Sequence, residues 1–367
     1  MAIVMAGVLV PAPAVAHPGT AAVLRHGVDD LHGLGITGVQ GLVRDGGRAV
    51  AASSGAAPVD GYFRIGSVTK TFVAVALLQL AGEGRIGLDD PVDRWLPGVV
   101  DGNGNDGRRV TVRHLLQQTS GLYDPTFDLT VWQSADGFAA HRFDHYAEKD
   151  LVATAMRHAP LFPAGTRWSY SNTNYLVAGM LLERVTGRPW QAAVRSRILA
   201  PLRLTHTFYP GDRVSLPRPH AEASKQFAPG GPLVGTTEFN PTVTGAAGGL
   251  VSTPADLAGF WQALERGRLL PPGQLAELHR TVPADDFQAL RPGIRYGLGV
   301  MWIPNRCGGA WAHLGSMPGM STLAAAGPGG RRSTVLYLAT ELADPDRDRA
   351  VVQRQLTLLD DLICQSR

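Results

Sequence analysis

The stretch FRIGSVTKTF, residues 63–72, organises the rest of the chain. From Val68 to Ala81 the residues favour a helix, because no Gly or Pro interrupts them and glycines follow at Gly82 and Gly84. Apolar residues lie on every side of this predicted helix. We therefore expect it to be buried and central.

Ser67 would stand at the start of this helix, where unpaired amides and the positive dipole end favour developing negative charge. Lys70 follows one turn later, so the two side chains share a face with Cβ atoms about 5–6 Å apart. A buried lysine is costly unless it is used or paired, and the chain has only two others, Lys149 and Lys225. The pair indicates a serine nucleophile beside an amine of lowered pKa. A serine cap with a snorkelling lysine has the same spacing.

The chain has 367 residues, 44% hydrophobic and 18% charged, which is typical of a globular protein with a substantial core. Its net charge is only +3, and no run of Lys and Arg could follow a phosphate backbone, so we expect no nucleic-acid partner. Beyond residue 20 no apolar run approaches 18 residues, which predicts no transmembrane anchor. We expect a monomer.

Residues 3–15 are apolar and end in Ala14-Val15-Ala16, a small-residue pattern typical of signal-peptide cleavage sites. We predict that residues 1–16 are a signal peptide, cleaved after Ala16, and that the mature protein is secreted.

Cys307 and Cys364 are the only cysteines. An even number in an exported protein predicts one disulfide, here between the strand region before His313 and the end of the chain. Two buried free thiols are the alternative.

Predicted strands lie at both ends of the chain, and helices lie between them. The expected helices are Thr20–Leu34, the one after Ser67, one entered at Thr111, Leu176–Val185, Leu257–Glu265 and Arg347–Ile363. The expected strands are Val39–Arg44, Arg48–Ala52, Gly297–Ile303, Ala310–His313, Ser321–Ala326 and Ser333–Thr340. Residues 124–149 are expected to be an irregular polar layer over a site.

This order predicts an α/β (α+β) fold, in which an antiparallel sheet is flanked by N- and C-terminal helices and receives an inserted all-helical subdomain. We predict one domain over residues 17–367. Its sheet part would comprise residues 17–66 and 245–367, and its helical part residues 67–244.

Two further motifs carry chemistry. Tyr170-Ser171-Asn172 offers a phenol for proton relay and an amide for a substrate carbonyl. His313-Leu314-Gly315-Ser316 ends a predicted strand, where glycine lets the backbone approach a ligand. Taken singly, Tyr170 would be a core tyrosine and His313 a structural histidine. The three motifs S-x-x-K, Y-x-N and H-x-G occur in this order, separated by about 100 and 140 residues. Together they indicate one common site.

That ordered set resembles the serine β-lactamase and penicillin-binding protein superfamily. More narrowly, the chain is similar to class C β-lactamases and to actinomycete extracellular D-alanyl-D-alanine carboxypeptidases, which have histidine where most relatives have the lysine of K-T-G. The likeness runs from about Leu24 to Cys364. It includes Val112–Leu116, Thr119–Tyr123, Tyr170–Asn174, Val177–Leu181, Tyr296–Gly299 and both cysteines.

The resemblance implies a β-lactamase/transpeptidase-like serine hydrolase in which Ser67 is the nucleophile and Lys70 and Tyr170 share the general-base and general-acid work. It implies that the amides of Ser67 and Ser316 form the oxyanion hole. Asn172 would bind the acyl side-chain amide, and His313 and Gly315 would line the strand edge at the substrate. No cofactor and no metal is needed.

Two positions depart from the carboxypeptidase pattern. Leu314 replaces a threonine, and Met301 falls where an arginine meets the substrate's terminal carboxylate. Arg306 or Arg331 is a candidate substitute for that arginine. Candidate aromatic residues beside the cleft are Phe127, Trp132 and Tyr123.

Two other patterns are interpreted as surface features. Residues 102–107 satisfy G-x-G-x-x-G, but no preceding strand and following helix frame them. In the same segment Asp101, Asn103 and Asn105 hint at a calcium loop, but glycine is missing at its sixth position and Val112 stands where calcium loops need glutamate. His141 and His145 have zinc-protease spacing, but Arg142 occupies the glutamate place.

The leading hypothesis is an exported serine D,D-carboxypeptidase, a penicillin-binding hydrolase that acts on D-alanyl-D-alanine stem peptides of peptidoglycan or another small acyl donor, with β-lactams as covalent inhibitors. The alternative is an esterase, D-amino-acid amidase or peptide transacylase or cyclase, which Leu314 and Met301 favour because such substrates need no free carboxylate. A class C-like β-lactamase comes third. A sensor that binds β-lactams without turnover is disfavoured, because it need not keep a nucleophile with its base.

Overall fold

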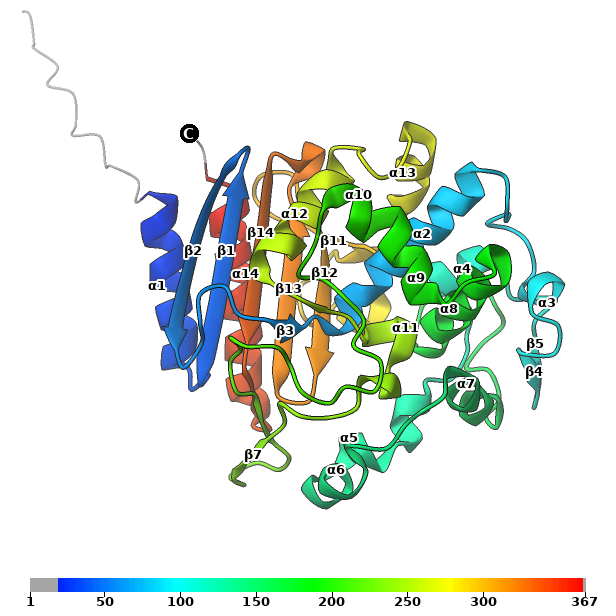
Figure 1. Ribbon diagram of the computed structural model, residues 1–367, viewed down its shortest axis with the longest axis horizontal. Helices are drawn as coiled ribbons and strands as arrows, with labels where there is room; N and C mark the ends of the chain where they lie inside the picture. Colours follow the sequence, from blue (N-terminus) through cyan, green and yellow to red (C-terminus); the bar gives the residue numbers. More distant parts are fainter. Residues whose placement is uncertain (1–18, 366–367) are drawn as a thin grey trace, which may run out of the picture.

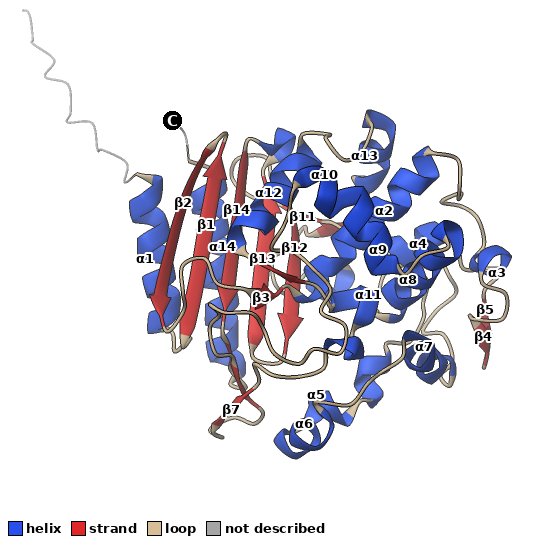
Figure 2. Cartoon of the chain, viewed as in Figure 1, coloured by secondary structure: helices blue, strands red, loops and turns tan. Residues whose placement is uncertain are grey.

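The computed structural model describes residues 19–365, so the predicted signal peptide lies outside the described residues. Its centre is an antiparallel sheet in the order β2-β1-β14-β13-β12-β11-β10-β9 (Figures 1 and 2). The strands are β1 (Gly38–Asp45), β2 (Arg48–Gly55), β9 (Val282–Pro283), β10 (Arg295–Tyr296), β11 (Met301–Ile303), β12 (Ala310–Met317), β13 (Met320–Ala326) and β14 (Arg332–Leu338).

Helices cover both faces of this sheet. The terminal helices α1 (Thr20–Gly33) and α14 (Pro345–Ile363) contact each other and one face, and α12 (Pro254–Glu265) packs on the other (Figure 1). Side chains of successive strand residues point to opposite faces. Accordingly, Leu336 belongs to the apolar cluster under the terminal helices and Tyr337 to the cluster that continues into the helical part.

The rest of the chain is mainly helical and lies beyond β12 (Figure 2). Its centre is α2 (Thr69–Gly82), preceded by a 3₁₀ turn at Gly66–Val68 and buried along nearly its whole length. α8 (Thr173–Thr186), α9 (Trp190–Val194), α11 (Gly245–Gly248) and α13 (Pro272–Leu278) pack against it. The other helices of this part are α3 (Val92–Trp95), α4 (Val112–Leu116), α5 (Thr130–Gln133), α6 (Ala135–His141), α7 (Glu148–Met156) and α10 (Ala200–Leu202).

The predicted layout is confirmed, with three differences in detail. Residues 124–149 hold the short helices α5 and α6 rather than irregular chain throughout. The strand predicted at Gly297–Ile303 begins only at Met301, because Gly299 has a φ of +81° that an extended strand does not adopt. The middle part also carries hairpins: β4 (Asp101–Gly102) with β5 (Asn105–Asp106), and β6 (Ser224–Gln226) with β7 (Leu233–Gly235).

Short strands outside the main sheet bring distant segments to the start of α2. β3 (Phe63–Arg64) pairs with β8 (Val251–Ser252), and β6 pairs in parallel with β15 (Thr340–Glu341). The division into residues 17–66 with 245–367 and residues 67–244 stays a proposal. Within residues 19–365, no helix has the length and apolar character that crossing a bilayer requires.

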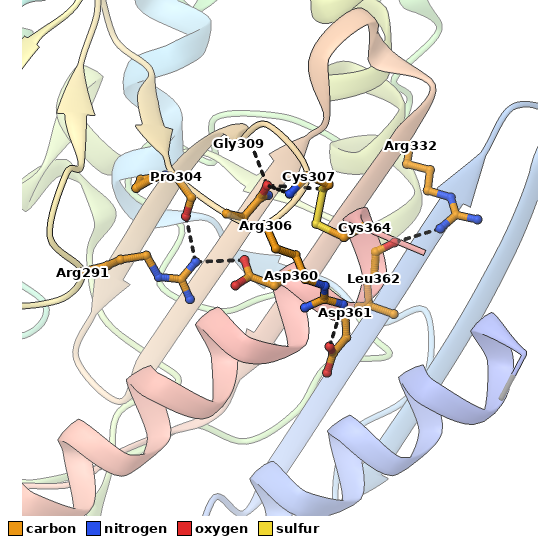
Figure 3. Close-up of a disulfide and its surroundings, with 11 residues drawn as sticks. Arg291, Pro304, Arg306, Cys307, Gly309, Arg332, Asp360, Asp361, Leu362 and Cys364 are labelled. Atoms are coloured by element: carbon orange, nitrogen blue, oxygen red, sulfur yellow. Dashed lines mark hydrogen bonds and ion pairs between the residues drawn. A yellow bond between two sulfur atoms is a disulfide. The ribbon is translucent and has the colours of Figure 1, made fainter. Parts of the chain in front are cut away.

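Cys307 and Cys364 form the predicted disulfide, which joins the loop before β12 to the end of α14 (Figure 3). Two ion pairs lie beside it: Arg306 of the same loop pairs with Asp361 at 3.1 Å, and Arg291, in the segment before β10, pairs with Asp360 at 2.9 Å (Figure 3). The disulfide closes a loop of 57 residues. It therefore anchors α14 to the sheet.

Replacing both cysteines by serine is expected to lower the free energy of unfolding by about 4 kcal/mol, because a loop of this length regains its freedom in the unfolded chain. Urea unfolding monitored by circular dichroism measures the change. Arg306→Gln is the matched control, since its ion pair is at the surface and is worth less than about 1 kcal/mol. A loss below about 1 kcal/mol in the double serine variant would contradict the anchoring role.

Candidate active site

Ser67 and Lys70 lie together at the start of α2, as the sequence predicts. The Lys70 Nζ donates to Ser67 Oγ over 3.1 Å. Ser67 is partly exposed and Lys70 is fully buried. The solvent-accessible hydroxyl of Ser67 therefore contacts the amine of Lys70, which solvent does not reach.

Two acceptors from other elements complete the surroundings of the Lys70 ammonium. Its Nζ donates to Asn172 Oδ1 and to the Ala247 carbonyl, both over 2.7 Å. Burial lowers the pKa of Lys70 from 10.5 to about 7, and the charge of Asp124 opposes this by raising it. Lys70 is thus neutral in a large share of molecules near pH 7. Only the neutral amine can accept a proton from Ser67.

Tyr170 stands on the other side of the pair. Its ring centroid is 4.8 Å from Lys70 Nζ, and its hydroxyl is a hydrogen-bond partner of Ser67. Burial raises the pKa of the Tyr170 phenol well above 10, and the bond to Ser67 opposes this. Tyr170 therefore keeps its proton at neutral pH and has one to donate.

The Tyr170–Asn172 segment is held by two polar residues that the sequence prediction missed. Asp124 accepts from the backbone and side-chain nitrogens of Asn172, both over 2.9 Å. The Gln118 side-chain Oε1 accepts from the Ser171 amide over 3.0 Å. Because Asp124 holds the Asn172 amide, Asn172 Oδ1 is turned toward Lys70.

A third missed residue, Glu148, supports the Ala247 carbonyl indirectly. Its carboxylate accepts from the Ala246 amide over 2.7 Å, and burial raises its pKa to about 7. Only Asp124 has a weak signal in the sequence, because it directly follows the Thr119–Tyr123 segment of the family resemblance. Gln118 and Glu148 follow no periodic pattern and carry no motif.

The edge of β12 forms the opposite wall of the site. β11 pairs with β12 only as far as Ala312, so the strand is free of β11 beyond it. There Gly66 and Gly315 allow close backbone approach: a Cβ on Gly66 would lie 2.9 Å from the Ser316 nitrogen, and one on Gly315 2.1 Å from the Ile65 carbonyl. This contact brings the backbone of Ser316 beside that of Ser67, which is the arrangement an oxyanion hole requires.

His313 lies on this edge, but its side chain is buried and lines neither half of the cleft. Its Nε2 is 2.9 Å from the Tyr296 hydroxyl. Burial and the nearby charge of Lys70 lower the pKa of His313 to about 3. It is therefore a neutral group behind the strand, and the expected contact with substrate is not supported.

The cleft has two halves that meet at Ser67, Ser316 and Glu341. The first, about 460 Å³, is also lined by Thr126, Phe127, Trp132, Gln133, Asn172, Lys225, Thr244, Gly248, Met317 and Pro318. The second, about 420 Å³, includes Tyr170, Phe287, Leu290, Leu314, Gly315, Met320 and Asp348. Because Tyr170 lies in the second, we call it the leaving-group half and the first the acyl half.

Of the aromatic candidates, Phe127 and Trp132 line the acyl half, and Phe127 is 69% exposed. Tyr123 lines neither half and instead stacks on His158 with ring centroids 3.7 Å apart.

The two patterns interpreted as surface features lie outside the cleft. Residues 102–107 belong to the β4–β5 hairpin. His141 pairs with Asp144, and His145 pairs with Asp212.

Neither the position of the carboxypeptidase arginine, Met301, nor the two candidate substitutes line the cleft. Met301 is buried in β11. Arg306 and Arg331 pair with Asp361 and Asp45 and line neither half of the cleft. The suggestion that one of these arginines replaces the carboxypeptidase arginine is therefore wrong.

Comparisons with known proteins agree with this geometry. The sequence profile of the Beta-lactamase family matches residues 21–358. A D-stereospecific amidohydrolase from Streptomyces sp. is 40% identical, with a TM-score of 0.84 over 91% of this chain and 98% of that one. The D-amino acid amidase of Ochrobactrum anthropi SV3, in complex with L-phenylalanine amide, is 26% identical, with a TM-score of 0.79 over 93% and 99%.

Penicillin-binding protein 4* of Bacillus subtilis is 27% identical over 307 residues, which are 79% of this chain. The match covers 63% of that relative, so this chain spans less than two thirds of its length. The amidohydrolase and the amidase, by contrast, are matched over nearly their full length.

The rate of Ser67 acylation is expected to follow the ionisation of Lys70. Since the neutral amine accepts the proton and its pKa is lowered to about 7, the rate should fall about tenfold per pH unit below pH 7 and level off above it. Stopped-flow acylation by a 4-nitrophenyl ester measures the profile. A first-order rise that continues to about pH 10 would mean an ordinary lysine.

Asp124→Asn is expected to shift that profile to lower pH, because the Asp124 charge raises the pKa of Lys70 and its removal leaves burial unopposed. The variant should also lose about tenfold in kcat/KM at pH 8, since Asn172 loses a charged acceptor. Asp128→Asn is the matched control: Asp128 bonds Tyr123 and His158 and touches neither Asn172 nor Lys70. A midpoint that stays in place or rises would refute the coupling.

Proposed function

Because this chain belongs to the β-lactamase family and has the fold of its serine hydrolases, we propose that it is a D-stereospecific amidohydrolase. Its substrates would be amides and esters of D-amino acids, cleaved through an ester on Ser67. The likeness to the Streptomyces amidohydrolase over 91% of this chain supports the substrate class.

The observation that carries the proposal is the lining of the leaving-group half. Its charged side chains are the carboxylates Glu341 and Asp348, and the remaining surface is largely apolar, with Phe287, Leu290 and Leu314 among its members. A D,D-carboxypeptidase must bind a terminal carboxylate in this position, which needs a cation or strong donors. An ammonia or alcohol leaving group has no such need, so the amidase alternative fits better than the carboxypeptidase that the resemblance first suggests.

The proposed reaction has two halves. Neutral Lys70 takes the Ser67 proton as Oγ attacks the carbonyl carbon, and the amides of Ser67 and Ser316 bind the developing oxyanion. The C–N bond then breaks, while the Tyr170 phenol gives its proton to the leaving nitrogen and recovers one from the Lys70 ammonium. Water attacks the ester by the reverse proton path, which releases the D-amino acid and restores the Ser67 hydroxyl.

Asn172 would bind the acyl portion beside Phe127 and Trp132. The same nucleophile would make β-lactams covalent inhibitors, in keeping with the family. Secretion remains part of the proposal: the disulfide is compatible with it, and the signal peptide of residues 1–16 rests on the sequence alone.

The enzyme is expected to release ammonia from D-phenylalanine amide at least about tenfold faster, in kcat/KM, than from the L-enantiomer. Ser67→Ala should lose about 10³-fold or more, whereas Ser54→Ala, a serine on β2 bonded to Asp29, is the matched control. Faster release of D-alanine from a diacyl-Lys-D-Ala-D-Ala peptide than of ammonia from D-phenylalanine amide would favour the carboxypeptidase instead.

A further inference from the structure

An ion pair lies in the wall of the cleft: Lys225 lines the acyl half, and Glu341 lines both halves. Lys225 on β6 and Glu341 on β15 are register partners of the parallel pair, with Nζ and Oε1 2.7 Å apart. The second Glu341 oxygen accepts from the Gly319 amide over 3.0 Å, in the turn that follows Ser316 and β12. Glu341 is therefore held from two sides, and neither bond is a chance surface contact.

The cleft has few charged side chains, so this ion pair determines the charge that a substrate meets. Among the described residues that line the two halves, Lys225 is the only cation, and Glu341 and Asp348 are the only anions. Lys225 also lies over the Phe227 ring, 5.1 Å from its centroid, which keeps its ammonium at the β6 side. The one positive charge that a substrate carboxylate could meet in the cleft is thus already neutralised.

We propose that Glu341 is a specificity-determining residue that excludes leaving groups with a free carboxylate. Such a group would meet the Glu341 charge directly, and it would find Lys225 already paired. A neutral leaving group meets no such repulsion. This inference rests on the proposed function, since it explains how the same acyl-transfer site discriminates between an amide and a peptide that ends in a carboxylate.

The test is a pair of substrates that differ only in that carboxylate: D-phenylalanyl-D-alanine amide and D-phenylalanyl-D-alanine. Glu341→Gln keeps the shape and still accepts from the Gly319 amide, but it removes the charge. The ratio of kcat/KM for the amide over the acid should fall at least about tenfold in this variant.

Lys225→Met should move the same ratio the other way, because Glu341 then loses its counterion and repels a carboxylate more strongly. A purely structural role would move both variants in one direction. Glu83→Gln is the matched control: Glu83 pairs with Arg197 at 2.7 Å and lines neither half of the cleft, so the ratio should not change.

A second pair of probes separates this inference from the proposed function: 4-nitrophenyl acetate and 3-carboxy-4-nitrophenyl acetate, which any serine hydrolase of this fold can be tested on. If the wild type cleaves no D-amino-acid amide, the proposed function fails, and the ester ratio in Glu341→Gln still decides the role of Glu341. A ratio within about twofold of the wild type, or a shift of both variants in the same direction, would overturn the inference.

Discussion

The structure depends on the burial of one ammonium group. Lys70 is fully buried at the start of α2, where an unpaired charge would be prohibitive. Three acceptors from three segments surround its Nζ: Ser67 Oγ, Asn172 Oδ1 and the Ala247 carbonyl. Two of these acceptors are themselves held in place. Asp124 holds Asn172, and Glu148 holds α11 through the Ala246 amide.

Burial also assigns different proton-transfer roles to Lys70 and Tyr170. It lowers the pKa of Lys70 to about 7 and raises that of Tyr170 well above 10, so each neighbour of Ser67 is driven toward its neutral form. A neutral amine accepts a proton and a neutral phenol donates one. Burial likewise favours the neutral form of His313, a buried residue of β12, whose pKa falls to about 3.

The sequence could predict what depends on pattern and motif. Helical periodicity located α1, α8, α12 and α14, and the S-x-x-K and Y-x-N motifs located Ser67, Lys70 and Tyr170 in one site. It could not predict contacts made by isolated side chains on loops and element ends. Asp124 and Glu341 act through partners 48 and 116 residues away in sequence, and no local spacing encodes such a meeting. Nor could it show that Arg306 is already paired with Asp361.

In the proposed mechanism the Lys70 amine activates Ser67, and the small number of lysines in the chain allows its pKa to be measured directly. The chain has three, so ¹⁵N-lysine labelling and NMR titration of the Nζ resonances give a spectrum in which Lys70→Arg assigns the signal of interest. We predict that this resonance titrates with a midpoint near pH 7. A Lys70 signal that stays protonated beyond about pH 10 would contradict the central claim, because Ser67 would then lack its base.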